Sequence, residues 1–110
     1  MLNGTFSVAG VTFNGRQHLL FDIMHKTENY YLTLRRNPHN RYDPNTIAVI
    51  LHSRNNKLHT QIGIVPPRLA ARLSPEIDSG KTIKVNFWQV NTFHDEDRLI
   101  AYCRINYILQ

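Results

Sequence analysis

The sequence predicts a mainly β fold with two helices, in which about six antiparallel strands curl into a small barrel. Three observations lead to this fold class: β-rich or alternating segments recur along the chain, two segments with helical periodicity interrupt them, and most connections have hairpin length. A chain of 110 residues buries roughly two-thirds of its unfolded surface. We therefore expect residues 1–110 to form a single domain.

The first half of the chain supplies four strands and one helix. Residues 6–13 are β-rich and end at Asn14-Gly15, a dipeptide that tolerates positive φ. A short helix is expected near residues 17–25, because apolar residues recur there at helical spacing. Three further segments are predicted as strands, the last two of them joined by a polar hairpin turn: residues 30–35, 46–52 and 60–65.

The second helix is expected to begin at Pro67, since proline suits the first turn of a helix. Pro75 is expected to kink this helix or to restart it with Ser74 as the cap, and Gly80 to end it. Gly63, within a strand, is expected to allow close backbone packing. The last two strands are predicted at residues 81–90 and 98–109, with a loop at 91–97.

Residues 37–46, Asn-Pro-His-Asn-Arg-Tyr-Asp-Pro-Asn-Thr, concentrate turn-forming residues between two of the expected strands. Pro38 and Pro44 fix φ and bias the residues before them away from the helical region. Three side chains can bond their own backbone in Asx-turns: Asn40, Asp43 and Asn45. The sequence therefore predicts a rigid loop that presents Tyr42 and Asp43.

The charge balance favours a polyanionic partner. Thirteen Lys and Arg stand against eight Asp and Glu, which gives a net charge of +5. Between residues 16 and 72 the sequence has nine basic residues and three acidic ones, so the excess surrounds the presented loop. Charge alone does not distinguish such a partner from an ordinary soluble surface. The acidic cluster at 94–97 is expected to face away from a polyanion.

Composition also indicates the compartment. Cys103, the lone cysteine, excludes an intramolecular disulfide and a thiolate zinc cluster, and its alternating segment predicts a core position. No leader pattern and no apolar run of membrane-spanning length is present, so we expect a cytoplasmic protein without a membrane partner.

The sequence shows no catalytic constellation. The glycines form neither a Gly-x-Gly-x-x-Gly pattern nor a Walker-type loop, which argues against nucleotide binding. Six histidines are scattered without a His-x-x-x-His pair, so we expect no metal, no cofactor and no catalytic residue in this chain. His39 stands apart because its place in the loop suits contact with a phosphate or a base.

The pattern Arg-x-Pro-x-Asn-x-Tyr-Asp-Pro-Asn-x-Ile-Ala-Val at residues 36–49, followed by Ile-Gly-Ile-Val-Pro at 62–66 before a helix, resembles the HIRAN family. The resemblance covers about residues 6–90. It implies an OB-like barrel that binds single-stranded DNA with a preference for free 3′ ends, as at stalled forks or damaged DNA. It also implies a fused or partner ATPase or nuclease, because HIRAN domains are modules of fork-remodelling ATPases and occur in bacterial and phage proteins.

Candidate roles follow from this resemblance and from side-chain chemistry. Asp43 would accept the 3′-hydroxyl in a charge-assisted bond and repel a 3′-phosphate. Tyr42 would stack on a base or sugar, and Asn40 would bond the sugar or hold the loop. Four arginines would neutralise the DNA backbone: Arg16, Arg35, Arg36 and Arg41.

Alternatives remain at each level. Asp43 can cap the turn and Tyr42 can plug the barrel mouth, and either role is compatible with binding. Gln17 replaces the aromatic residue that follows the early arginine in eukaryotic members, and Ile64 replaces a histidine, so a relaxed end preference is expected. The alternative function is a protein-interaction or structural β-barrel module without direct DNA contact. A metal-dependent nuclease would require Asp22 to approach Asp43.

Overall fold

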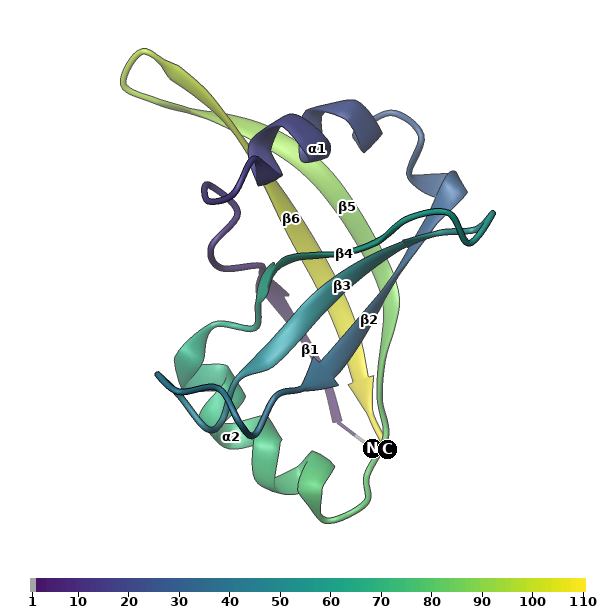
Figure 1. Cartoon of the computed structure of the whole chain (residues 1–110), viewed down its shortest axis with the longest axis vertical. Coiled ribbons are helices and arrows are strands. Elements are labelled where there is room, and N and C mark those ends of the chain that lie inside the picture. The colour runs from purple at the N-terminus through teal and green to yellow at the C-terminus, as the bar shows by residue number, and fades with distance from the viewer. Residues whose placement is uncertain (1) are drawn as a thin grey trace.

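Two three-stranded antiparallel sheets face one another across a shared apolar core (Figure 1). The computed structural model describes residues 2–110, with the backbone alone for Leu2. The elements in chain order are β1 (Leu2–Ser7), α1 (Arg16–Ile23), the 3-10 helix η1 (Thr27–Asn29), β2 (Tyr30–Arg36), β3 (Ile47–Ser53), β4 (His59–Ile64), α2 (Pro67–Asp78), β5 (Ile83–Asp95) and β6 (Arg98–Leu109). The predicted order of strands and helices is confirmed, with η1 as an addition.

The strand orders are β1-β6-β5 in one sheet and β2-β3-β4 in the other. A main-chain bridge joins the two sheets on one side: the amide of Ala9 donates to the oxygen of Ile64 at 2.9 Å, and the amide of Ile64 donates to the oxygen of Ala9 at 3.0 Å. On the other side, β2 lies beside β5 around a cavity of about 210 Å³. The structure thus confirms a mainly β fold of six strands and two α-helices.

The core lies between the sheets and explains the alternation in the sequence. In the central strand β3, the inward side chains of Ile47, Val49 and Leu51 are fully buried. Cys103 and Ile105 of β6 meet them from the other sheet and are also fully buried. Burial raises the pKa of the Cys103 thiol to about 12, so the thiol stays protonated at neutral pH. The predicted core position of this cysteine is confirmed.

The first strand was predicted at residues 6–13 but ends earlier, at Ser7. Gly10 adopts a φ of 79°, which takes the chain out of the extended conformation. Asn14 and Gly15 then adopt φ values of 58° and 75°, as their turn dipeptide predicts, and α1 begins at the next residue. The segment between β1 and α1 is therefore an irregular loop, tied to β6 by the bond from the amide of Val8 to the oxygen of Cys103 at 2.9 Å and to β4 by the Ala9–Ile64 bridge.

The expectation that the second helix would restart at Pro75 is wrong, because α2 continues through Pro75 to Asp78 as one helix. Proline removes one helical hydrogen bond, which frees the carbonyl of Ala71. Ala71 and Pro75 are both exposed, so solvent can satisfy that carbonyl. Ser74 is not a cap either. It is nearly buried, at 1% exposure, and its hydroxyl reaches out of the helix to the loop described below.

The loop predicted at residues 91–97 is also wrong, because β5 and β6 stay paired to Asp95 and Arg98. The polar alternation of an exposed hairpin resembles that of a loop, which explains the error. The tip consists of Glu96, at a φ of 56°, and Asp97. Figure 1 shows that this hairpin projects from the body at the end of the molecule opposite the loop between β2 and β3.

The bridge at Gly63 yields a stability prediction. A Cβ atom at this position would collide with the main-chain oxygen of Ala9 and the side chain of Val8, which confirms that Gly63 permits close backbone packing. We expect Gly63→Ala to lower the free energy of unfolding by about 1–3 kcal/mol, the usual cost of overpacking. Urea denaturation measures this change. Lys84→Ala, an exposed change in β5, serves as the control and should stay within about 0.5 kcal/mol. Equal stability of Gly63→Ala and the wild type would contradict the account.

Candidate nucleic-acid interface

The loop of residues 37–46 connects β2 to β3 and is held by its own side chains. At its base, the amide of Asn37 donates to the oxygen of Thr46 at 2.8 Å. Oδ1 of Asn40 accepts from the amides of Tyr42, at 2.9 Å, and Asp43, at 3.1 Å. Oδ1 of Asp43 accepts from the amide of Asn45 at 2.9 Å. The predicted Asx-turns at Asn40 and Asp43 are therefore confirmed, and so is the turn-capping role of Asp43.

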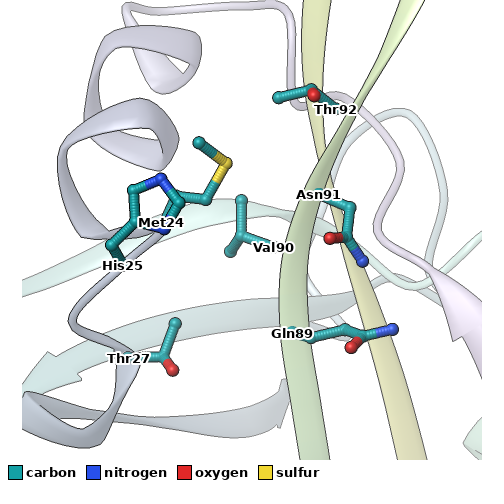
Figure 2. Close-up of a pocket in the computed structure, with 7 residues that line it drawn as sticks. All are labelled: Met24, His25, Thr27, Gln89, Val90, Asn91 and Thr92. Atoms are coloured by element: carbon teal, nitrogen blue, oxygen red, sulfur yellow. The ribbon is translucent and has the colours of Figure 1, made fainter.

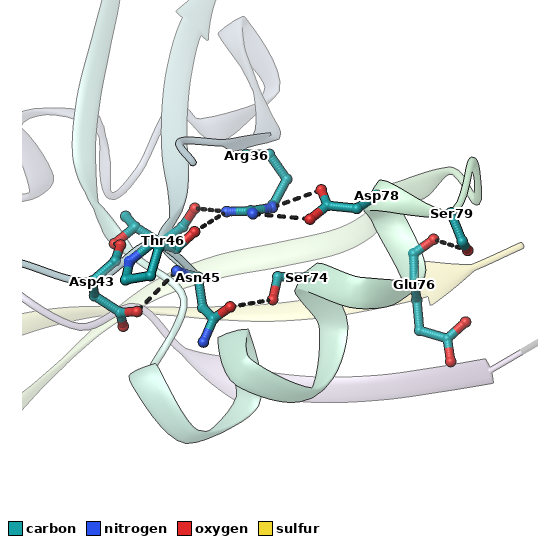
Figure 3. A network of polar contacts seen from close by, with 9 residues as sticks. Arg36, Asp43, Asn45, Thr46, Ser74, Glu76, Asp78 and Ser79 are labelled. Carbon is teal, nitrogen blue, oxygen red and sulfur yellow. Dashed lines mark hydrogen bonds and ion pairs between the residues drawn. The ribbon is translucent and has the colours of Figure 1, made fainter. Parts of the chain in front are cut away.

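A second set of bonds ties the loop to α2 (Figure 3). The hydroxyl of Ser74 donates to Oδ1 of Asn45 at 2.9 Å, so Asn45 reaches the helix rather than capping a turn. Arg36, at the end of β2, donates from Nη1 to the oxygens of Pro44, at 2.8 Å, and Thr46, at 3.1 Å. Its Nε and Nη2 donate to the two carboxylate oxygens of Asp78, each at 3.0 Å. One guanidinium thus holds a strand, the loop and a helix together.

The ion pair between Arg36 and Asp78 shifts the pKa of each partner in the direction that keeps that partner charged. The hydrogen bond to Asp78 raises the pKa of Arg36 above its usual value, against a smaller opposing effect of burial. The hydrogen bond from Arg36 lowers the pKa of Asp78 below its usual value. The side chain of Arg36 is only 13% exposed, whereas that of Asp78 is 55% exposed. The guanidinium of Arg36 therefore donates four hydrogen bonds to protein acceptors, out of the five that its N–H groups could make.

The loop presents Tyr42 to solvent. Its side chain is 86% exposed, so the alternative in which Tyr42 plugs the barrel mouth is wrong. The guanidinium of Arg41 lies 5.4 Å from the centre of the Tyr42 ring, within the range of a cation–π contact. Arg41 and His39 are exposed in the same loop. An aromatic ring, a cation and an imidazole therefore lie on one stiff segment.

Asp43 is half-buried beside Tyr42, and its two carboxylate oxygens differ. Oδ1 belongs to the turn, as described above. Oδ2 has no hydrogen-bond partner within residues 2–110. The main-chain oxygen of Asp43 accepts from the amide of Thr46 at 3.1 Å and from its hydroxyl at 2.6 Å. The carboxylate is thus fixed in orientation through one oxygen while the other stays available to a donor.

Two of the four predicted arginines, Arg16 and Arg35, lie outside the loop. Arg16 starts α1 and donates from Nη1 to the oxygen of Gly10 at 2.8 Å, which holds the preceding turn. Figure 1 shows that this turn and the 37–46 loop are separate, with the end of β4 and the start of α2 between them. Arg35 lies in β2 beside Arg36 but is exposed, because successive strand residues point to opposite faces. The structure brings together Asn40, Tyr42, Asp43, Arg41 and His39, with Arg36 at the base of the loop.

Gln17 has a role that the sequence did not reveal. Its Oε1 accepts from the amide of Ala101 at 2.8 Å, and its Nε2 donates to the oxygen of Ala101 at 2.7 Å and that of Val11 at 3.0 Å. These bonds attach the start of α1 to β6. The amide is committed to this attachment.

A second polar cluster, which the sequence analysis did not predict, lies on the outward side of β2, β3 and β4. The rings of Tyr31 and His52 stack at 4.7 Å, and Nδ1 of His52 lies 2.6 Å from Nδ1 of His59. Nε2 of His52 lies 2.7 Å from Oγ1 of Thr33. Burial, followed by the charges of His59 and Arg35, lowers the pKa of His52. The sequence could have indicated this cluster, because His52 and His59 flank the polar turn at 53–57 and pair across the hairpin.

A cavity of about 400 Å³ lies between the end of α1 and β5, and it contains none of the predicted residues (Figure 2). Figure 2 shows that the amide groups of Gln89 and Asn91 point away from His25. Its polar side chains therefore do not converge on one ligand position, and we assign no binding role to it.

Two further observations concern metals and membranes. Within residues 2–110, no three His, Cys, Asp or Glu side chains form a group that would hold a metal ion. In the same part of the chain, no helix has both the length and the apolar character needed to cross a bilayer.

Comparison with known proteins adds a family assignment. The family model for the HIRAN domain matches residues 4–105. Among solved structures, the crystal structure of the HIRAN domain of human HLTF aligns with a TM-score of 0.49 and 21% identity, over 96% of this chain and 74% of that chain. No curated protein matches the sequence.

The contrast between Arg36 and Arg35 can be tested by a matched pair of substitutions. Arg36→Ala removes the bonds to Asp78, Pro44 and Thr46, so we expect the free energy of unfolding to fall by about 2 kcal/mol, as for hydrogen bonds to a charged group. Arg35→Ala, one residue away and exposed, should change it by less than about 0.5 kcal/mol. Chemical denaturation of both variants decides this. Equal effects would show that Arg36 does not hold the loop.

Proposed function

The chain belongs to the HIRAN domain family, and on that basis we propose that it binds single-stranded DNA and receives a free 3′ end at the 37–46 loop. HIRAN domains are generally associated with DNA binding and are binding modules rather than catalytic domains. The proposal goes further than the family assignment in naming the strand type, the end and the residues. It rests on the loop geometry and on the chemistry of a 3′-hydroxyl.

The observation that carries the proposal is the free Oδ2 of Asp43, held beside the exposed ring of Tyr42. A 3′-hydroxyl needs an acceptor, and an ionised carboxylate is a strong one. Because Oδ1 is bonded to the amide of Asn45, little side-chain freedom is lost when Oδ2 accepts. Tyr42 offers its ring to the terminal base or sugar, with a stacking contribution of roughly 1–3 kcal/mol per base.

The neighbouring residues divide into contact and positioning roles. Arg41 and His39, both exposed in the loop, are assigned to phosphates or bases near the 3′ end. Asn40 and Arg36 are assigned to positioning, because their polar atoms already bond the loop. Arg16 is assigned to the turn before α1, away from the terminal nucleotide.

End preference is expected to depend mainly on Asp43. The commitment of Gln17 to Ala101 and Val11 leaves it unable to act as a stacking platform. Ile64 offers no polar group in place of a histidine. We therefore propose a relaxed preference for 3′ ends rather than a strict one. Any ATPase or nuclease activity would belong to a fused or partner domain, and the module would act inside the cell, where DNA is found.

Asp43→Asn isolates the charge from the turn. The amide oxygen of asparagine can still accept from the amide of Asn45, so stability should change little, whereas the charged acceptor is lost. We expect about tenfold weaker binding of an oligonucleotide with a free 3′-hydroxyl, which corresponds to about 1.4 kcal/mol. A 3′-phosphorylated oligonucleotide should bind equally well or better, because a repulsive charge has gone. Competition fluorescence anisotropy measures both affinities.

Glu96→Gln at the hairpin tip is the matched control, since it makes the same change of charge far from the loop. It should leave the ratio between the affinities for the two oligonucleotides unchanged. An unchanged ratio between the two ends in Asp43→Asn would end the hydroxyl hypothesis. DNA binding weakens as salt rises, so it should be detectable at low salt. If the wild-type protein binds no oligonucleotide even there, the alternative of a protein-interaction or structural module is supported instead.

A further inference from the structure

The outward side of the β2–β3–β4 sheet is basic, and the three strands contribute no carboxylate to it. None of its three strands contains Asp or Glu. Inward residues such as Leu32 and Val49 pack in the core, so Tyr31, Thr33 and Arg35 of β2 point outward. In Figure 1 this side faces the viewer, in front of β5 and β6. We call the surface formed by Arg35, Thr33, Tyr31, His52, His59 and Arg54 the outer sheet face.

Its two arginines lie at opposite ends. Arg35 is exposed and makes no ion pair within the described part of the chain. Arg54 follows β3, and its guanidinium lies 5.7 Å from the centre of the Tyr31 ring. Glu28, in η1, contributes its main-chain oxygen to Nε of Arg54 at 2.9 Å. The Nη atoms of Arg54 make no hydrogen bond to protein within residues 2–110, so they remain able to donate to a phosphate.

Between the arginines the face offers rings and hydrogen-bonding groups. Tyr31 stacks on His52, and His59 meets His52 edge-on at 4.9 Å between ring centres. The exposed ring of His59 ends this row. Cations interleaved with rings along an open sheet are the surface that single-stranded nucleic acids use, through phosphate neutralisation and stacking.

The outer sheet face continues directly from the loop. Arg35 lies two residues before Asn37, the first residue of the loop, and about 13 Å of strand separates Arg35 from Tyr31. We propose that the DNA strand whose 3′ end lies at Asp43 continues along the outer sheet face, with its 5′ side directed towards Arg54. This inference rests on the proposed function. It sets a polarity and a length, at the short end of the roughly 4–16 nucleotides that OB folds bind.

A length series tests the proposal. Thymidine oligonucleotides of three and eight nucleotides, each with a free 3′-hydroxyl, compete for the wild-type protein in an anisotropy assay. The three-nucleotide oligomer can occupy the loop alone, whereas the eight-nucleotide oligomer also covers the sheet. We expect at least tenfold tighter binding of the longer oligomer. Arg35→Glu should remove most of that advantage while changing the affinity of the shorter oligomer by less than about twofold.

Two further variants complete the design. Arg104→Glu makes the same charge change on the outward side of the other sheet, and it should preserve the advantage of the longer oligomer. Lys57→Glu, in the exposed turn after Arg54, should reduce that advantage and provides a second reading if Arg35→Glu does not fold. Thermal unfolding of each variant establishes that the fold is retained.

The outcomes separate the inference from the proposed function. Equal affinities of the two oligomers for the wild type, with Asp43→Asn still altering end preference, overturn the inference and leave the proposed function standing. Equal weakening of the longer oligomer by Arg35→Glu and Arg104→Glu also overturns it, because only overall charge would then matter. If neither oligomer binds the wild type, both proposals fail.

Discussion

The guanidinium of Arg36 is the constraint on which the candidate site depends. It bonds Asp78 through Nε and Nη2 and the oxygens of Pro44 and Thr46 through Nη1, so a strand end, a loop and a helix share one side chain. A solvent-exposed ion pair alone would contribute little, about 0–1 kcal/mol. Here the side chain of Arg36 is largely buried, and its N–H groups also donate to loop carbonyls. The ion pair therefore fixes the loop relative to α2. The position of Asp43 relative to the sheet follows from it.

Much of the fold was predictable because it is encoded locally. Alternation placed β2 and β6, turn residues placed the bend at Asn14-Gly15, and asparagine and aspartate chemistry predicted the Asx-turns. What the sequence did not reveal are bonds between distant residues. Arg36 and Asp78 are 42 residues apart, and Gln17 and Ala101 are 84 apart. No local pattern distinguishes a surface arginine from one that anchors a loop, and none indicates that the Gln17 side chain links α1 to β6.

The candidate site was predicted as a set of residue types, and the structure sorts that set by position. Asn40, Tyr42, Asp43, Arg41 and His39 share one stiff loop, whereas Arg16 supports a different turn. Arg35 and Arg36 are adjacent in sequence but differ in their contacts, because successive residues of a strand point to opposite faces. The same alternation, read across a hairpin, joins His52 to His59 and extends the basic surface away from the loop.

The central claim is that the 37–46 loop receives the 3′ end of a DNA strand. Nuclear magnetic resonance of the ¹⁵N-labelled protein, titrated with a thymidine trinucleotide that carries a free 3′-hydroxyl, tests it most directly. The account predicts that the largest amide shift changes fall within residues 40–46, and that a 3′-phosphorylated trinucleotide produces smaller ones. Largest changes around the cavity beside Met24 and Asn91, or along the β5–β6 hairpin, with the loop unaffected, would contradict it.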